Sequence, residues 1–230
     1  MSVVIEARGV VRIYRQDDEE VHALRGVDLF VESGEFVAVM GPSGSGKSTL
    51  LHLLGGLDRP DTGEVLVEGQ MLAELGETAL SELRRRRLGF VLQFFNLLPT
   101  LSAEENVAFP LMLDGRRDAI ERARQALDRV GLLDRARYRP GQLSGGEQQR
   151  VAVARAVVTK PAVVLADEPT GSLDSLSGED VLRLLRSVAD GDQAVVMITH
   201  EPFAAAYADR VVRLRDGVVA ASDDMVETTR

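Results

Sequence analysis

Hydrophobic and polar positions along the chain form two kinds of strand pattern. Val3–Val11, Val21–Val31 and Glu64–Glu68 are rich in β-branched residues interspersed with polar ones. This pattern predicts an antiparallel sheet with one solvated face. Other segments are continuous apolar runs, which are typical of strands buried on both faces of an α/β fold. They are Phe36–Met40, Gly89–Leu92, Val163–Ala166 and Val195–Thr199.

Helical spacing of apolar residues appears in Ala103–Ala136, Glu147–Val158 and Ser177–Ala189. Good helix formers are frequent in these segments, so we predict helices there. The stretch from about residue 94 to residue 158 is then a mostly helical insert in a single domain that covers residues 1–230. The longest apolar runs are far shorter than the ~18 residues that a membrane span needs, so we expect no span.

Composition and charge narrow the classes of protein. The chain has 230 residues with 45% hydrophobic residues, and 27 Lys+Arg against 36 Asp+Glu give a net charge of -9. These values fit a folded globular protein and exclude disorder for most of the chain. The chain has no Cys, which excludes disulfides and Cys-ligated zinc and favours a cytosolic setting. The acidic balance argues against non-specific nucleic-acid binding. Arg84–Arg87 is interpreted as the solvated end of a helix.

A glycine-rich segment follows the buried strand Phe36–Met40 and precedes a helical run that starts at Thr49. Its residues match the phosphate-loop pattern in the order Gly41, Pro42, Ser43, Gly44, Ser45, Gly46, Lys47 and Ser48. The loop glycines let backbone N–H groups surround a phosphate, and the helix start favours an anion. Lys47 would neutralise the β- and γ-phosphates, and the Ser48 hydroxyl would bind Mg²⁺. The alternative is a glycine-rich turn without a ligand, which this strand–loop–helix context disfavours. We include Thr49 among the predicted nucleotide-binding residues.

Polar side chains follow the other buried strands. Asp167 and Glu168 come at the end of one apolar run, and neighbouring residues of a strand point to opposite sides. Asp167 can therefore face a metal ion while Glu168 faces an attacking water. Gln93 and His200 follow two further buried strands, and ligands of open α/β sheets bind at these carboxyl ends. We predict that Gln93 reaches the metal or the water and that His200 reaches the γ-phosphate or Glu168. An exposed turn and incidental surface residues are the alternatives.

A second glycine-rich helix start occurs at Leu143–Arg150, where Ser144 is a good N-cap residue. A helix start with free N–H groups is another anion site. One nucleotide does not need two such segments from a single chain. The sequence therefore indicates a composite site shared between two copies, and the alternative is an ordinary cap with flexible glycines.

These motifs, in this order, resemble those of ATP-binding cassette (ABC) ATPases over essentially the whole chain. The resemblance implies a phosphate-loop NTPase with a RecA-like core, an antiparallel β-subdomain and a helical signature subdomain. It implies ATP and Mg²⁺ as ligands, with Ser48, Gln93 and Asp167 at the metal. Tyr14 would stack on the adenine, and Asp174 would cross the interface of an ATP-dependent homodimer. The signature would be Leu143–Gln148, which includes Gly145 and Glu147, and its Ser144 and Gly146 would touch the γ-phosphate held by the opposing subunit.

Residues 89–110 resemble more narrowly the ATPases of lipoprotein-releasing and macrolide-export transporters and of their cell-division relatives. The resemblance implies a separate membrane permease and a place on the cytoplasmic face of the cell membrane. Phe94, Phe95, Leu97 and Leu98 follow Gln93 as an apolar cluster. We predict that a groove lined by part of Phe94–Leu101 receives the permease, the alternative being that these residues pack the helical lobe.

Other classes fit the sequence less well. Cassette ATPases that act on nucleic acid carry long coiled coils or Cys-ligated zinc, and translation-factor cassettes come in pairs. A small GTPase needs an Asn-Lys-x-Asp motif, which neither Asn96 nor Asn106 begins. A non-transporting regulator of cell-wall remodelling that acts through a similar permease is the remaining alternative. The transported substrate, the direction of transport and the identity of the permease have no signature in this chain.

Overall fold

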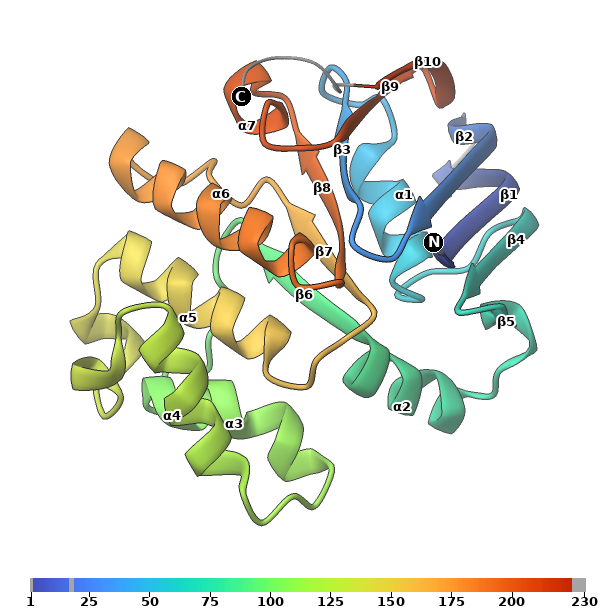
Figure 1. Cartoon of the computed structure of the whole chain (residues 1–230). Coiled ribbons are helices and arrows are strands. Elements are labelled where there is room, and N and C mark those ends of the chain that lie inside the picture. The colour runs from blue at the N-terminus through green and yellow to red at the C-terminus, as the bar shows by residue number, and fades with distance from the viewer. Residues whose placement is uncertain (1, 17–18, 225–230) are drawn as a thin grey trace.

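The computed structural model describes residues 2–16 and 19–224, which form two sheets with helices around them (Figure 1). The first sheet is antiparallel and has the order β2-β1-β4-β5. Its strands are β1 (Val3–Gln16), β2 (Glu19–Glu32), β4 (Thr62–Val67) and β5 (Gln70–Met71). The predicted antiparallel sheet is confirmed, and its first two strands are longer than expected.

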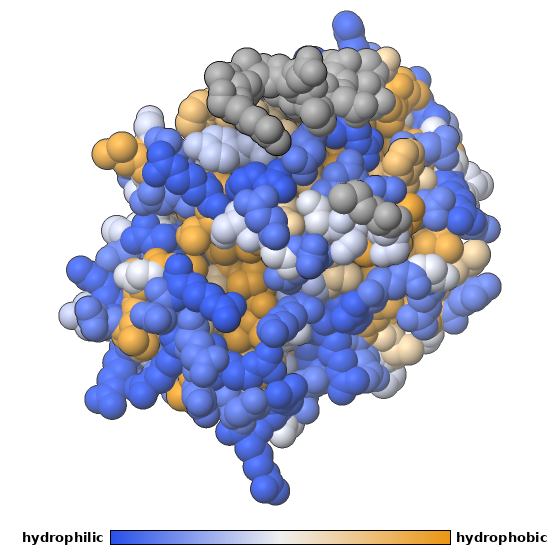
Figure 2. Space-filling model, in the orientation of Figure 1, coloured by the Kyte–Doolittle hydropathy of each residue, from blue (hydrophilic) through white to orange (hydrophobic). Residues whose placement is uncertain are grey.

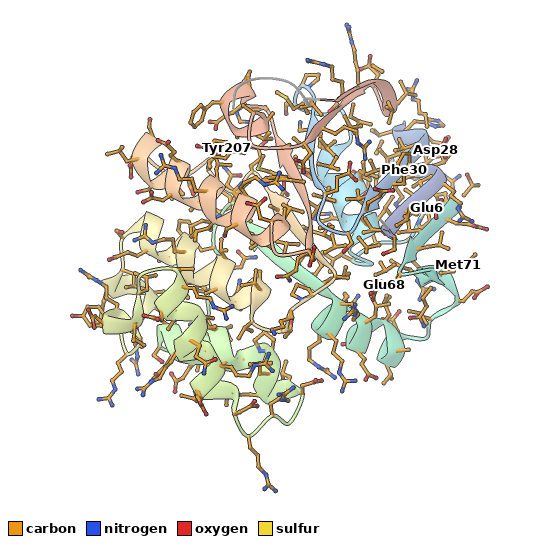
Figure 3. All side chains as sticks on the ribbon, in the orientation of Figure 1. Glu6, Asp28, Phe30, Glu68, Met71 and Tyr207 are labelled. Atoms are coloured by element: carbon orange, nitrogen blue, oxygen red, sulfur yellow. The ribbon has the colours of Figure 1, made fainter. Side chains whose placement is uncertain are left out.

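One face of this sheet is solvated, as the alternating pattern predicts. Along β2, Leu29 and Val31 are buried whereas Phe30 is 55% exposed. Figure 3 shows Glu6, Asp28 and Phe30 on this sheet. The guanidinium of Arg210 lies 5.1 Å from the centre of the Phe30 ring, which shields part of this exposed aromatic side chain.

The second sheet has the order β10-β9-β3-β8-β7-β6 and is parallel from β9 to β6. Four of its parallel strands, β3, β6, β7 and β8, match the predicted apolar runs, so this prediction is confirmed. The strands β9 and β10, which pair antiparallel at one edge, were not predicted. The six are β3 (Phe36–Met40), β6 (Leu88–Leu92), β7 (Val163–Asp167), β8 (Ala194–Thr199), β9 (Arg210–Arg215) and β10 (Val218–Asp224).

Side chains of β3 alternate between two hydrophobic clusters. Val37 and Val39 belong to the cluster that includes α1 and the antiparallel sheet. Phe36 and Ala38 belong to the cluster on the other face, beneath α6. This period of two buries both faces of the central sheet, which is why its strands are continuous apolar runs. The helices outside the helical lobe are α1 (Lys47–Leu54), α2 (Glu77–Arg87), α6 (Ser175–Ala189) and α7 (Pro202–Ala205).

A third hydrophobic cluster joins α3 (Ala103–Leu113), α4 (Ala119–Arg129) and α5 (Gly145–Val157), which we call the helical lobe. The single helical run expected over residues 103–136 is wrong in one respect, because α3 ends before Asp114 and Gly115 turns the chain with φ 71°. Asn106, which is fully buried, donates to the backbone oxygens of Leu98, Leu101 and Ser102. Short 3₁₀ helices lie at Leu72–Glu74, Leu133–Arg135 and Pro140–Gln142.

The arginine run ends α2 as predicted, but these side chains are paired rather than free in solvent. Arg85 and Arg86 both donate to Asp114 at the end of α3, at 2.9 Å. Arg87 pairs with Glu68, which Figure 3 labels beside α2. The run therefore links the helical lobe and the antiparallel sheet to the end of α2.

Hydrophilic side chains cover most of the face shown in Figure 2, and apolar side chains are visible between α5 and α6. Among residues 2–16 and 19–224, no helix combines the length and the apolar character that a membrane-spanning segment requires.

Candidate functional site

The carboxyl ends of the four predicted strands lie in one row, because β3, β8, β7 and β6 are consecutive parallel neighbours. This edge places the loops after all four strands next to one another, as predicted for ligand sites of open α/β sheets. The loop after β3 is the phosphate loop.

The phosphate loop runs from Gly41 to Gly46, and α1 begins at Lys47. Gly46 caps the helix with φ 100°, and a Cβ atom on this residue would lie 2.3 Å from the backbone oxygen of Ala23. Only glycine fits this conformation and this contact. Within the loop, the Ser45 hydroxyl is buried and bonds to no other described residue. The end of the loop therefore packs directly against the backbone of β2.

Lys47 is buried, with 7% of its surface exposed. Its Nζ donates to the backbone oxygens of Gly41 and Pro42 at 2.8 and 2.9 Å. The ammonium group therefore lies against the loop that precedes its own helix, where a bound phosphate would meet it. Ser48 is exposed at the helix start and Thr49 is half-buried behind it.

Asp167 is the last residue of β7 and lies near this helix start. Burial, together with the neighbouring Glu168 charge, raises the pKa of Asp167, and the nearby His52 and a hydrogen bond from Ser48 oppose that shift. One carboxylate and one hydroxyl group therefore meet beside Lys47. Among the described residues, no group of three His, Asp or Glu side chains could hold a metal ion. A Mg²⁺ site formed by Ser48 and Asp167 fits this donor set, because Mg²⁺ is commonly held by one carboxylate plus substrate phosphates and waters.

Glu168 adopts φ 43°, a left-handed conformation that is uncommon for a residue with a side chain. Its N–H donates to the Ile198 oxygen, and its Oε1 lies 3.1 Å from Nδ1 of His200. The structure therefore brings Glu168 and His200 together. This is one of the two contacts that the sequence predicts for His200. The side chains of Asp167 and Glu168 meet different partners, but the cause is not the predicted strand alternation, because β7 ends at Asp167 and Glu168 is left-handed.

Gln93 follows β6 and is half-buried. Its backbone oxygen accepts a hydrogen bond from Ser172 Oγ at 2.8 Å. A Cβ atom on Gly171 would lie 2.9 Å from Gln93 Nε2, so the glutamine side chain contacts the loop that follows Glu168. The sequence does not indicate this hydrogen bond, because the oxygen that accepts it belongs to the backbone and is present at every residue.

Ser144 begins α5 with a capping box. Its hydroxyl accepts from the Glu147 N–H, and a Glu147 carboxylate oxygen accepts from the Ser144 N–H at 2.8 Å. This bond lowers the pKa of Glu147. Asp174 caps α6 in a similar way, since it accepts from the N–H and the hydroxyl of Ser177. A Cβ atom on Gly146 would lie 2.6 Å from Ser177 Oγ, so these two helix starts are in direct contact.

Tyr14 lies on β1 and is 38% exposed. Its hydroxyl donates to Asp58 at 3.0 Å, and the Arg12 guanidinium lies 4.8 Å from the ring centre. The predicted contact between Tyr14 and adenine stays a prediction.

The starts of α1 and α5 lie on different parts of the molecule in Figure 1. One chain thus carries two separated glycine-rich helix starts, of which one has the predicted metal residues beside it. Fold and site together define a phosphate-loop nucleotide-binding protein.

Comparisons with known proteins agree with this class. The sequence model of the ABC transporter family matches residues 24–171. The lipoprotein-releasing system ATP-binding protein LolD of Chromohalobacter salexigens is 51% identical over 219 residues, which are 94% of this chain and 92% of that protein. The macrolide export ATP-binding/permease protein MacB of Shigella flexneri is 45% identical over 229 residues, which are 99% of this chain but only 35% of that protein.

A solved structure is also similar. The dimeric, post-hydrolysis structure of the ATP-binding cassette MJ0796, bound to ADP and Pi, has a TM-score of 0.89 and 39% identity, and the match covers 97% of this chain and 100% of that one. The chain described here belongs to the ABC transporter family and is an ATP-binding ATPase of that family. The fold class and the resemblance inferred from the sequence are confirmed.

Proposed function

We propose that the chain is the ATP-hydrolysing subunit of a transporter and drives a separate permease at the cytoplasmic face of the cell membrane. The observation that carries this proposal is the presence of two separate glycine-rich helix starts in one chain. The loop of Lys47 and the start of α5 are both suited to phosphate, and they lie apart in one chain (Figure 1). Two copies arranged head to tail would complete two sites.

The first half of the site would hold ATP and Mg²⁺. Backbone N–H groups of the loop and the Lys47 ammonium would bind the β- and γ-phosphates. Ser48 and Asp167 would hold the metal ion, with Gln93 as a third ligand from the neighbouring loop. Mg²⁺, when bound, would neutralise charge that develops on the phosphate oxygens.

Glu168 and His200 would form the catalytic part. Glu168 would orient the attacking water and take its proton at a carboxylate oxygen. His200, at 3.1 Å, would hold this carboxylate in place and reach the γ-phosphate from β8. The pair would act from one side, while Lys47 neutralises the phosphate from the other.

The second half of the site would come from a second copy of the chain. The cassette MJ0796, to which this chain is similar, is dimeric in the structure with ADP and Pi. Ser144, Gly145 and Gly146 would present the start of α5 to the γ-phosphate held by the partner. The Glu147 carboxylate is occupied in the cap, so it would act by fixing Ser144. Asp174 and Ser177 adjoin Gly146 and would lie at the same interface.

A hollow of about 360 Å³ between α2, β6 and α3 would receive the permease. Apolar side chains dominate its lining, among them Leu57, Phe90, Phe109 and Leu113. Arg155 also lines it and donates to the backbone oxygens of Phe95 and Asn96, which connects the hollow to the segment predicted for docking.

The apolar side chains of the segment predicted for docking differ in their exposure to solvent. Phe94 is 72% exposed and Leu98 is 40% exposed, whereas Phe95 and Leu97 are half-buried. Leu97 packs against the hydrophobic cluster of the helical lobe. We therefore assign the docking role to Phe94 and Leu98 together with the hollow.

The relatives LolD and MacB are named for lipoprotein release and macrolide export, which favours transport or release over a regulatory role in cell-wall remodelling. A lipoprotein, a peptide or a drug is the class of cargo that these names suggest. No partnership with nucleic acid is proposed.

Glu168→Gln tests this proposal, because the amide keeps the shape of the carboxylate and accepts no proton. Hydrolysis should fall by about 10²- to 10⁴-fold, the range for general base catalysis, while ATP still binds. Gel filtration with ATP and Mg²⁺ should show a dimer. The same variant combined with Ser144→Arg, which blocks the start of α5, should stay monomeric. A monomer in the single variant at high protein concentration would contradict the shared site.

A further inference from the structure

Gln149 lies in α5, shortly after the helix start at Ser144, and its side chain is fully buried. Its Nε2 donates to the backbone oxygen of Pro169 at 2.8 Å and to that of Leu92 at 3.3 Å. Its Oε1 is also buried and accepts no hydrogen bond from the part of the chain that the structure describes.

The two carbonyl groups belong to residues next to the proposed active centre. Leu92 directly precedes Gln93, and Pro169 directly follows Glu168. Glu168 itself has the left-handed φ of 43°. The Gln149 amide therefore fixes the backbone next to Gln93, the proposed metal ligand, and next to Glu168, the proposed base for the water.

Arg155 holds the same segment from further along α5. It donates to Asn96 at 2.6 Å and to Phe95 at 2.9 Å, and these two residues have φ values of 47° and 60°. Such conformations cost free energy and persist only where surrounding contacts impose them. Gln93 thus lies between two points that are bonded to α5, so a displacement of α5 must displace the Gln93 segment.

We propose that Gln149 is a positioning residue that couples the two ATP sites of the dimer. The inference rests on the proposed function, in which the start of α5 reaches the γ-phosphate held by the partner. ATP bound in the partner's site would fix the position of α5. Because Gln149 is hydrogen-bonded to Leu92 and Pro169, the backbone at these two residues would then be fixed as well. Gln93 and Glu168 would then be set for hydrolysis only when the other site is filled, so the coupling acts on turnover.

A substitution can separate the positioning role of Gln149 from its contribution to packing. A buried oxygen without a partner is costly, and an apolar side chain of similar length would fill the same space without that oxygen. Gln149→Met therefore removes both donors with little change in volume. Gln193→Met is the matched control, because Gln193, which directly precedes β8, is another half-buried glutamine and its Nε2 donates to the backbone oxygen of Pro161.

The experiment measures kcat, the Hill coefficient for ATP, the Kd for ATP and the melting temperature of both variants and of the wild type. For Gln149→Met we expect kcat to fall at least about tenfold and the Hill coefficient to fall towards 1. The Kd for ATP should stay within about twofold of the wild-type value, because the phosphate loop is untouched. The control should keep the wild-type values.

A Gln149→Met protein with wild-type kcat and Hill coefficient would overturn the inference. So would a loss of kcat matched by an equal loss in the control, or a wild-type Hill coefficient of 1. If the methionine variant unfolds, the smaller Gln149→Leu lacks the same donors and gives the same readouts. Failure of the proposed function would appear without any change at Gln149, as absent Mg²⁺-dependent hydrolysis or an absent Glu168→Gln dimer.

Discussion

Nδ1 of His200 lies 3.1 Å from Oε1 of Glu168, although 32 residues separate them in the sequence. Parallel pairing of β7 with β8 produces this contact, because each residue follows the end of its own strand. His200 can therefore act on Glu168 as well as on a phosphate.

His200→Ala should lower turnover more than nucleotide binding. Loss of the ring frees the Glu168 carboxylate and removes a polar group from the γ-phosphate, so we expect kcat to fall about 10²-fold, within the range of acid–base contributions. The Kd for ATP should change by no more than a few-fold. His22→Ala, an exposed histidine on β2, is the control. Equal losses of kcat in the two variants would disprove the assignment.

Lys47→Ala should abolish ATP binding or hydrolysis. The change removes the buried cation of the loop and both of its bonds to Gly41 and Pro42, so the phosphate charge would be left to backbone dipoles. Lys160 is exposed and is the other lysine of the chain, so Lys160→Ala serves as control. Titration with a fluorescent ATP analogue and a steady-state ATPase assay measure both effects. ATPase activity near the wild-type level in Lys47→Ala would refute the role of Lys47.

Phe94 and Leu98 should bind the permease. When both are changed to Ser, the ATPase should no longer co-purify with the permease from detergent-solubilised membranes. Its melting temperature and ATP affinity should stay close to wild type. Exposed aromatic anchors often contribute most of the binding free energy at interfaces, which supports a large effect. Leu133→Ser, which alters an exposed leucine of a 3₁₀ helix, is the control. Continued co-purification of the double variant with the permease would place the docking site elsewhere.

Glu147 should stabilise the fold in a pH-dependent way. Its bond from the Ser144 N–H holds its pKa below the ordinary value of 4.5. The carboxylate therefore contributes stability above the unfolded-state pKa, and this contribution is lost as the pH falls through the lower folded-state pKa. We expect Glu147→Gln to lose about 1 kcal/mol of unfolding free energy at pH 7, a typical cap value, and little near pH 3.

Denaturant unfolding at the two pH values measures this difference. Glu121→Gln alters an exposed carboxylate on α4 and serves as the control. A loss that is the same at both pH values would show that the charge of Glu147 does not matter.

The strands β3, β6, β7 and β8 were predictable because burial on both faces demands a continuous apolar run, as in Phe36–Met40 and Val195–Thr199. The strand β9 was missed because arginines at positions 210, 213 and 215 interrupt its apolar residues. The break between α3 and α4 was missed because helical spacing persists on both sides of Gly115. Local pattern therefore identifies continuous apolar strands, including the edge strand β6, better than strands interrupted by charged residues and better than turns.

The phosphate loop and the ends of β6, β7 and β8 could be located from the sequence, because their residue types follow buried strands. The links between them could not. Gln149 and Arg155 look like ordinary polar residues of a helix, and their partners are backbone oxygens more than 50 residues away for Leu92 and Asn96. Such bonds leave no pattern in a single sequence, because a carbonyl group is present at every position.

The alternation of β3 side chains between two hydrophobic clusters has a consequence for the loop that follows. Opening this strand would disrupt both clusters at once, so its amides should exchange with solvent deuterium only through global unfolding. The phosphate loop is anchored at this strand and at α1, whose side chains belong to the same core. The conformational entropy of the loop is therefore lost when the chain folds, and little of it remains to oppose association with a nucleotide.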